Sequence, residues 1–173
     1  ALLGFLRRRP MHGYEIHLQL SDPAGLGLVW RMKQSQLYAL LAKLEREGYI
    51  AATLELQEPR PPRKVFHLTE QGRAAFEAWL ASPVPHGREL RLDFLAKLYF
   101  ARREGVDVVQ RLVARQRRAC LEWLDEQRRS AEQLRERHPF EWLVHQFRVG
   151  QIEAMLAWLD TCEQSLLVVE PAP

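Results

Sequence analysis

The sequence is poor in the features that mark secreted and membrane proteins. It contains only two cysteines, Cys120 and Cys162, without Cys-x-x-Cys spacing, so we expect free thiols in a reducing cytoplasm. No run of apolar residues approaches the length of a membrane span, and no secretory signal pattern opens the chain. We therefore expect a cytoplasmic protein without a membrane partner.

Motifs of catalysis and metal binding are missing as well. There is no Gly-rich phosphate loop, no Gly-x-Ser-x-Gly elbow and no His-Glu-x-x-His, and most carboxylates stand beside Lys or Arg on predicted helices. His12 and His17 lack an Asp, Glu or Cys partner at ligand spacing, which favours surface or capping histidines over a metal site. We expect no enzyme activity, no catalytic residue, no metal and no cofactor.

Positive charge is modest and unevenly distributed along the chain. The formal net charge is +3 over 173 residues. Residues 1–81 carry 11 Lys or Arg against 8 Asp or Glu, whereas residues 82–173 carry 14 of each. The whole excess lies in the first half, where a surface that binds nucleic-acid phosphates would place it.

The segment 33–50, KQSQLYALLAKLEREGYI, has the pattern of an amphipathic helix with a smooth outer face. Its inward stripe is formed by leucines at three- and four-residue steps: Leu37, Leu40, Leu41 and Leu44. The opposite side is short or polar: Ser35, Ala39, Ala42 and Arg46, flanked by Gln36, Tyr38 and Lys43. Gly48 predicts a left-handed end of the helix. Such a face suits a DNA major groove, although an ordinary surface helix has the same pattern.

Two runs rich in strand-forming residues, 50–57 and 64–68, follow this helix. Between them lies Glu58-Pro-Arg-Pro-Pro-Arg-Lys, and three prolines do not fit a central strand. We therefore expect an exposed hairpin tip that carries Arg60, Arg63 and Lys64. Thr69 is expected to cap the next helix. Helix, hairpin with a basic tip and further helix is the layout of a winged helix-turn-helix.

With these segments in this order, the chain resembles the PadR family of bacterial transcriptional regulators. The matching pieces are LLGFL and MHGYEI (2–6 and 11–16), SQLYALLAKLEREGYI (35–50), KVFHLTEQGR (64–73) and FLAKLYFA (94–101). The family pattern usually has Ser or Thr, Gly and Pro where this chain has Lys33, Ser35 and Ala39. The resemblance implies a mainly α fold with a small β-hairpin wing, and a dimeric DNA-binding regulator, which we expect to be a repressor.

A proline-rich segment, Ser82-Pro-Val-Pro-His-Gly87, marks the predicted domain boundary. We predict a winged-helix DNA-binding domain at 1–81, a linker at 82–88 and an all-helical dimerisation domain at 89–173. The last predicted helix, 139–167, is apolar over more than half its circumference, which one small domain cannot bury alone. A second copy of the chain is expected to cover it through Phe140, Leu143, Phe147, Gly150, Ala154 and Trp158.

Residues predicted to bind double-stranded DNA fall into two groups. Lys33, Gln34, Ser35 and Gln36 open the recognition helix, where amides and hydroxyls can read base edges. Phosphate contacts are expected mainly from Tyr38, Lys43, Arg60, Arg63 and Lys64. An alternative of a different class remains, in which the basic wing serves protein–protein assembly without specific DNA binding.

Four tryptophans raise the question of an effector. Members of the PadR family commonly respond to small aromatic or amphipathic molecules, and others to no known ligand. Such a molecule could be held by Trp79, Trp123, Trp142 and Trp158, because aromatic walls suit flat apolar ligands. The same residues also fit core and interface aromatics, and we favour that interpretation.

Overall fold

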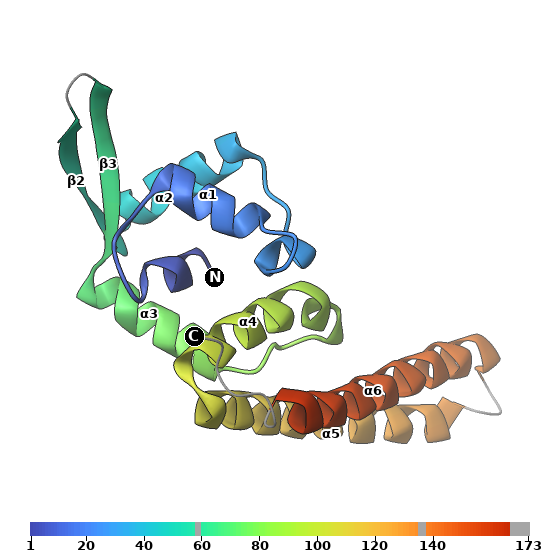
Figure 1. Cartoon of the computed structure of the whole chain (residues 1–173). Helices are drawn as coiled ribbons and strands as arrows, with labels where there is room; N and C mark the ends of the chain where they lie inside the picture. Colours follow the sequence, from blue (N-terminus) through green and yellow to red (C-terminus); the bar gives the residue numbers. More distant parts are fainter. Residues whose placement is uncertain (58–59, 135–137, 167–173) are drawn as a thin grey trace. The chain divides into compact units, whose positions relative to one another are not determined.

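A computed structural model describes residues 1–57, 60–134 and 138–166, and it consists mainly of helices with one small sheet (Figure 1). In chain order the elements are η1 (Leu2–Leu6), β1 (Met11–His12), α1 (Gly13–Ser21), η2 (Leu26–Leu28), α2 (Gln34–Arg46), β2 (Ile50–Gln57), β3 (Arg60–Leu68), α3 (Glu70–Ala81), η3 (Gly87–Glu89), η4 (Leu90–Phe94), α4 (Leu95–Glu104), α5 (Val106–Leu134) and α6 (Pro139–Leu166). The predicted fold class, mainly α with a β-hairpin wing, is confirmed. Contacts divide the chain into unit 1, residues 1–81 with 95–100, and unit 2, residues 82–94 with those from 101 onward.

The sheet of unit 1 has the antiparallel strand order β1-β3-β2. The long hairpin of β2 and β3 is the wing, and its base is set by the pairing of Ile50 with Leu68. Near the tip Gln57 pairs with Arg60. The two residues of β1 add a short third strand, which the sequence patterns did not predict.

The second strand of the wing begins earlier than predicted, at Arg60 rather than Lys64. Pro61 and Pro62 therefore lie inside a strand that we expected them to exclude. In this part β3 pairs with β2 alone, because β1 reaches only its last few residues, and the ladder shifts register beside Gln57. A proline, which lacks a backbone N–H, is tolerated where a strand has one neighbour and an irregular ladder.

In the core of unit 1, aromatic side chains of η1, α3 and α4 pack together. The Phe100 ring of α4 packs edge-on against Phe5 and Phe76, at centroid distances of 5.3 and 5.7 Å. Gly4 leaves room for it, since a Cβ there would lie 2.6 Å from Phe100 Cε1. By their contacts residues 95–100 thus group with unit 1, whereas the prediction placed them in the second domain.

Unit 2 is built on an antiparallel hairpin of the two longest helices, α5 and α6. Apolar residues at three- and four-residue steps fill its seam, as the spacing predicted for α5: Val109, Val113, Cys120 and Leu124 from α5 with Ile152, Leu159 and Cys162 from α6. Both cysteines are free, and burial raises the pKa of Cys162 to about 11. Within the described ranges, no helix is long and apolar enough to cross a membrane.

Polar contacts join the two helices of this hairpin and attach the segment around Val84 to it. Arg117 of α5 binds Asp160 and Glu163 of α6, at 2.6 and 2.9 Å. The buried Gln116 side chain accepts a hydrogen bond from the backbone N–H of Val84 (2.8 Å). Because Val84 is fully buried, the segment predicted as a linker is packed into unit 2.

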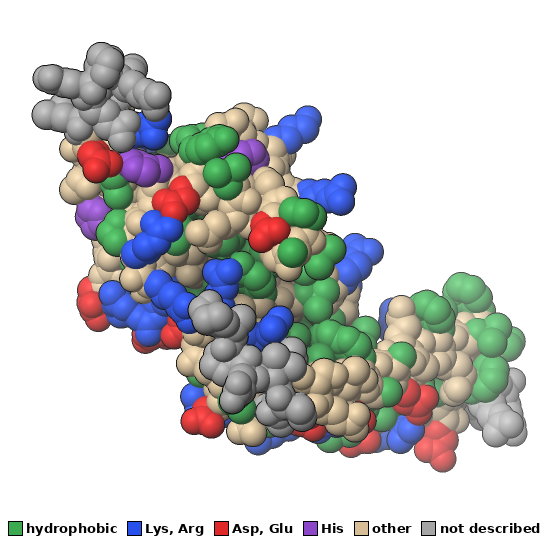
Figure 2. Space-filling model, in the orientation of Figure 1, with side chains coloured by type: hydrophobic (Ala, Val, Ile, Leu, Met, Phe, Trp, Pro, Cys, Tyr) green, Lys and Arg blue, Asp and Glu red, His purple; other side chains and the backbone are tan. Residues whose placement is uncertain are grey.

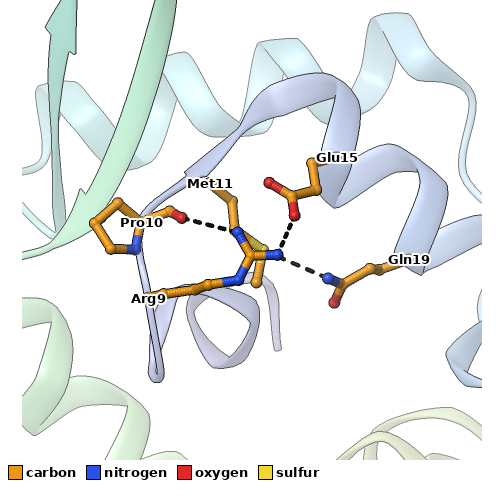
Figure 3. A network of polar contacts seen from close by, with 5 residues as sticks. All are labelled: Arg9, Pro10, Met11, Glu15 and Gln19. Atoms are coloured by element: carbon orange, nitrogen blue, oxygen red, sulfur yellow. Dashed lines mark hydrogen bonds and ion pairs between the residues drawn. The ribbon is translucent and has the colours of Figure 1, made fainter.

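Arg9 closes the turn that leads into α1 (Figure 3). Its guanidinium binds the Glu15 carboxylate and donates to the carbonyl oxygen of Pro10 (3.4 Å). Gln19 Nε2 reaches the Met11 sulfur on the same side, at 3.7 Å. The hydrogen bond from Arg9 lowers the pKa of Glu15 below its ordinary value of 4.5. The start of α1 therefore depends on an ionised Glu15.

Replacing Glu15 by Gln should destabilise the protein at neutral pH and have less effect in acid. A carboxylate with a lowered folded pKa stabilises the fold above its unfolded pKa, and the contribution disappears as pH falls through the folded pKa. Urea unfolding from neutral to acidic pH measures this, and the difference from wild type should shrink below about 4.5. Glu122→Gln, at an exposed residue of α5, is the control. A difference that stays constant with pH would contradict the assignment.

Candidate nucleic-acid interface

The outer face of α2 is the surface that the sequence predicted. Gln34, Ser35 and Gln36 are exposed in its first turn, while Leu37 and Leu41 are buried beneath it. Short and charged side chains continue the exposed face further along: Ala39, Ala42, Lys43 and Arg46. The helix thus offers a polar first turn and a smooth flank, which is the shape that a major groove admits.

Gln36, one of the residues predicted to read bases, caps the first turn of α2. Gln36 Oε1 accepts the backbone N–H of Lys33 at 3.1 Å, which satisfies a donor at the start of the helix. Lys33 itself is exposed and cannot accept a hydrogen bond through its side chain. Gln36 therefore has a structural role besides any contact with DNA, whereas Gln34 and Ser35 have no described side-chain partner.

At its other end α2 stops in the left-handed turn that Gly48 predicted, with φ of +78°. The N–H of Gly48 donates to the carbonyl of Glu45 (3.1 Å), and the N–H of Tyr49 donates to that of Leu44 (3.0 Å). This pair of bonds is the Schellman motif, which satisfies the last carbonyls of a helix. The chain then turns directly into the wing at Ile50.

Thr69 joins the end of α2 to the start of α3. Its hydroxyl lies 2.7 Å from the Gly48 carbonyl oxygen and 3.0 Å from that of Tyr49, and it accepts the N–H of Gly72 at 3.0 Å. The predicted cap of α3 is therefore confirmed. Gly72 packs so closely that a Cβ would collide with the Tyr49 carbonyl oxygen. We call Gly48, Tyr49, Thr69 and Gly72 the wing junction, because both ends of the wing start from it.

Two of the predicted phosphate contacts are held within the protein. Lys64 Nζ lies 3.0 Å from the Glu45 carboxylate, so it joins the wing to the last turns of α2. Lys43 lies 3.7 Å from Glu47, one turn along the same helix. Arg63 is exposed and forms no ion pair within the described part of the chain. Arg60 lies in β3, but its side chain is outside the described set.

Tyr38 is half-exposed and lies against the first residue of α1. A Cβ on Gly13 would be 2.8 Å from Tyr38 Cε1 and 3.2 Å from its hydroxyl oxygen, so only glycine leaves room for this ring. The hydroxyl is thereby placed beside the N-terminus of α1, where a phosphate is favoured by the free N–H groups.

Arg46, which the helical pattern placed on the outward side of α2, is exposed and unpaired in the described structure. Arg31, which the sequence patterns did not single out, is exposed and unpaired as well. His12 lies between Glu55 (3.2 Å) and the Lys64 carbonyl (3.3 Å), so it ties β1 to the wing. No local signal pointed to this contact. Figure 2 shows Lys and Arg side chains at separate points over the visible face of unit 1, with acidic and histidine side chains between them.

The four predicted effector tryptophans occupy different surroundings. Trp79 lies in unit 1 against Phe76, Phe100 and the Lys97 ammonium. Trp158 packs on Phe94 in unit 2 (6.0 Å between centroids), and Trp142 is half-buried on α6. Trp123 lines a cleft of unit 2. Trp79 and Trp158 are half-buried and pack on aromatic rings of their own units.

One side of α6 is left exposed and apolar. Phe140, Leu143 and Phe147 are 74%, 57% and 67% exposed, and Figure 2 shows hydrophobic side chains gathered at this end of α6. Gly150 and Ala154 continue the same side, and a Cβ on Gly150 would meet nothing within 4 Å. Five of the six predicted interface residues therefore share one uncovered face, whereas the sixth, Trp158, is packed within the chain.

The described residues contain no group of three His, Cys, Asp or Glu side chains that could hold a metal ion. The chemistry of the surface is thus that of hydrogen-bonding amides and hydroxyls, arginine and lysine charges, and one apolar helix face. Such groups bind and position; none of them forms a nucleophile–base pair with the contacts described above.

Both parts of the chain are similar to known protein families. Residues 2–78 match the sequence model of the transcriptional regulator PadR-like family, and residues 90–166 match that of the virulence activator alpha C-terminal region. The negative transcriptional regulator PadR of Bacillus subtilis (strain 168) is 32% identical over 112 residues, which are 62% of this chain and 60% of that protein.

One further relative and one solved structure extend the comparison. The probable transcriptional regulator Rv1176c of Mycobacterium tuberculosis (strain ATCC 25618 / H37Rv) is 31% identical over 84 residues, 49% of this chain and 43% of that protein. The alignments thus span less than two thirds of either curated relative. The crystal structure of Bacillus subtilis PadR in complex with operator DNA is 25% identical, with 95% of this chain and 94% of that chain covered and a TM-score of 0.47.

Replacing Gly72 by Ala should destabilise unit 1 although alanine is the better helix former. Helix propensity alone predicts a gain of about 1 kcal/mol, whereas forcing a methyl group against the Tyr49 carbonyl should cost about 1–3 kcal/mol net. Denaturant unfolding measures the sign, and Ala74→Gly on the exposed side of α3 measures the propensity term in the same helix. A Gly72→Ala protein more stable than wild type would show that the wing junction is not closely packed.

Proposed function

Because this chain belongs to the PadR-like family of transcriptional regulators, we propose that it is a homodimeric repressor that reads two related DNA half-sites with α2 and the wing. The observation that carries the proposal is the exposed polar first turn of α2, held on a rigid frame beside the wing. Repression is the direction supported by the name of the curated Bacillus subtilis relative, a negative transcriptional regulator.

Recognition and anchoring are assigned to different residues. Gln34 and Ser35 donate and accept at base edges, since neither side chain has a described partner in the free protein. Lys33, Tyr38, Arg63 and the exposed residues Arg31 and Arg46 meet phosphates, which position the protein without reading sequence. Lys64 contributes less to affinity, because its ammonium is already neutralised by Glu45.

The second copy is proposed to pack along the exposed face of α6. At 100° per residue this face lies opposite the seam that Ile152 and Leu159 form with α5. An apolar stripe on one side and an intrachain seam on the other is the pattern of a helix that serves two interfaces. A dimer is also what specificity requires, because one winged helix contacts only a short DNA segment.

Residue sizes along the stripe favour an antiparallel pairing of the two α6 helices. In that arrangement Phe140 faces Ala157 of the other copy, Leu143 faces Ala154, and Phe147 faces Gly150. Every large side chain then meets a small one, as in close-packed helix interfaces. A parallel pairing would instead place Phe140 on Phe140 and Gly150 on Gly150, which alternates collisions with gaps. The two-fold axis is therefore proposed to pass between Phe147 and Gly150.

Replacing Arg63 by Ala should weaken binding to every DNA sequence, whereas replacing Gln34 by Ala should change sequence preference. The first substitution removes a phosphate contact and the second removes a base-edge donor and acceptor. Electrophoretic shifts with the DNA upstream of the protein's own gene, at several salt concentrations, measure both. Arg63→Ala should lower the slope of log affinity against log salt by about 1.

Arg118→Ala, at an exposed arginine on α5, is the matched control and should leave DNA binding unchanged. Equal loss from Arg118→Ala and Arg63→Ala would mean that the wrong surface has been assigned to DNA. A wild-type protein that prefers no DNA sequence would favour the protein–protein alternative for the wing.

Exchanging the sizes at the proposed axis should test the dimer and its register together. Gly150→Phe alone places two phenylalanines in one layer, and Phe147→Ala alone leaves a gap, so each should weaken the dimer about tenfold or more. The double variant F147A/G150F restores one large and one small residue per layer and should regain the dimer. Sedimentation velocity at micromolar concentration measures the dimer fraction.

Leu121→Ala, at an exposed leucine on α5, is the control for loss of apolar surface outside the stripe. A double variant that associates no better than Gly150→Phe alone would overturn the antiparallel register. A wild-type chain that sediments as a monomer would overturn the dimer itself.

A further inference from the structure

A cleft of about 900 Å³ lies within unit 2, between residues 85–91 and the facing sides of α5 and α6. Its apolar wall is formed by Trp123, Ile152 and Met155. Gly87 brings the segment that precedes η4 close to α6, since a Cβ there would lie 2.9 Å from Met155 Cε. The volume falls in the range of small-molecule sites, about 300–1,000 Å³.

Three arginines line the same cleft: Arg88, Arg91 and Arg148. One carboxylate, that of Glu126, lines it with them. None of the three guanidiniums has an ion pair or hydrogen bond in the described structure. Elsewhere in the helix pair Arg117 binds Asp160 and Glu163, and Arg128 binds Glu153 at 2.7 Å, whereas Arg118 is exposed and, like the cleft arginines, has no ion pair in the described structure. What distinguishes Arg88, Arg91 and Arg148 is that all three line one cleft.

The charges that line the cleft specify the ligand more closely than its volume does. Three guanidiniums against one carboxylate leave an excess of two positive charges, which a dianion neutralises and a monoanion does not. A phosphate monoester carries close to two negative charges at neutral pH, and its oxygens accept the forked hydrogen bonds of arginine. Trp123 offers a flat apolar surface beside these groups, suited to a ring on the phosphate.

We propose that this cleft binds a small organic phosphate with a flat ring, the phosphate held by Arg88, Arg91 and Arg148 and the ring held against Trp123. Ile152 and Met155 exclude water from the far side of the ring. A role as an effector site rests on the proposed regulatory function: the ligand would bridge α5 and α6, and α6 carries the proposed dimer face. The binding site itself does not depend on DNA recognition.

Calorimetric titration of the full chain without DNA tests the site with probes that share one ring. 1-Naphthyl phosphate should bind saturably at one site per chain, about tenfold more tightly than 1-naphthoate, and 1-naphthol should bind more weakly still. Arg91→Gln and Arg148→Gln should each weaken naphthyl phosphate binding about tenfold, while Arg118→Gln, outside the cleft, should not. Trp123→Ala should weaken the binding of naphthyl phosphate but leave the binding of inorganic phosphate unchanged.

Three results would overturn the proposal: no saturable binding at millimolar naphthyl phosphate, equal binding of naphthoate and naphthyl phosphate, or binding that the cleft variants leave intact. Loss of DNA affinity in Arg91→Gln and Arg148→Gln without naphthyl phosphate binding to wild type would instead assign the arginines to DNA. Since the titration contains no DNA, its failure leaves the proposed repressor function standing. Failure of DNA binding in gel shifts likewise leaves the cleft to be judged by titration.

Discussion

The wing junction is the constraint on which the proposed DNA-binding surface depends. One threonine hydroxyl, from Thr69, contacts the carbonyls that end α2 and caps the helix that follows the wing. Gly48 supplies the left-handed turn, and Gly72 lets the two helix ends approach. Because Ile50 and Leu68 pair beside this point, the base of the wing is fixed relative to α2 by local bonds. The Lys64–Glu45 contact adds a second attachment nearer the tip.

In unit 2, different faces of α6 make different contacts. The inward side of α6 packs on α5 through Ile152 and Leu159, and ion pairs such as Arg117–Asp160 fasten the hairpin. The outward side stays apolar, which is unfavourable in water unless a second surface covers it. The unpaired arginines line the cleft and are not part of the exposed apolar face of α6. Association with a second copy and binding of a ligand therefore need not involve the same residues.

Sequence patterns predicted what depends on local spacing and missed what depends on contacts between distant residues. The faces of α2, the turn at Gly48 and the cap at Thr69 follow from helical periodicity and capping chemistry, so they were predicted. Gln36 as a capping acceptor and Lys64 as a partner of Glu45 were not, because both residues also fit a DNA contact. The grouping of residues 95–100 with unit 1 depends on the Phe100 ring and could not be read from the helix that contains them.

We propose that two copies joined through α6 place two recognition helices on one DNA duplex. Hydroxyl-radical footprinting on the DNA upstream of the gene tests this arrangement, because it maps each protected backbone position. We expect two protected groups related by a two-fold axis, with centres about one helical turn, roughly 34 Å, apart or a multiple of it. A single protected group, or uniform protection along the fragment at every protein concentration, would contradict it.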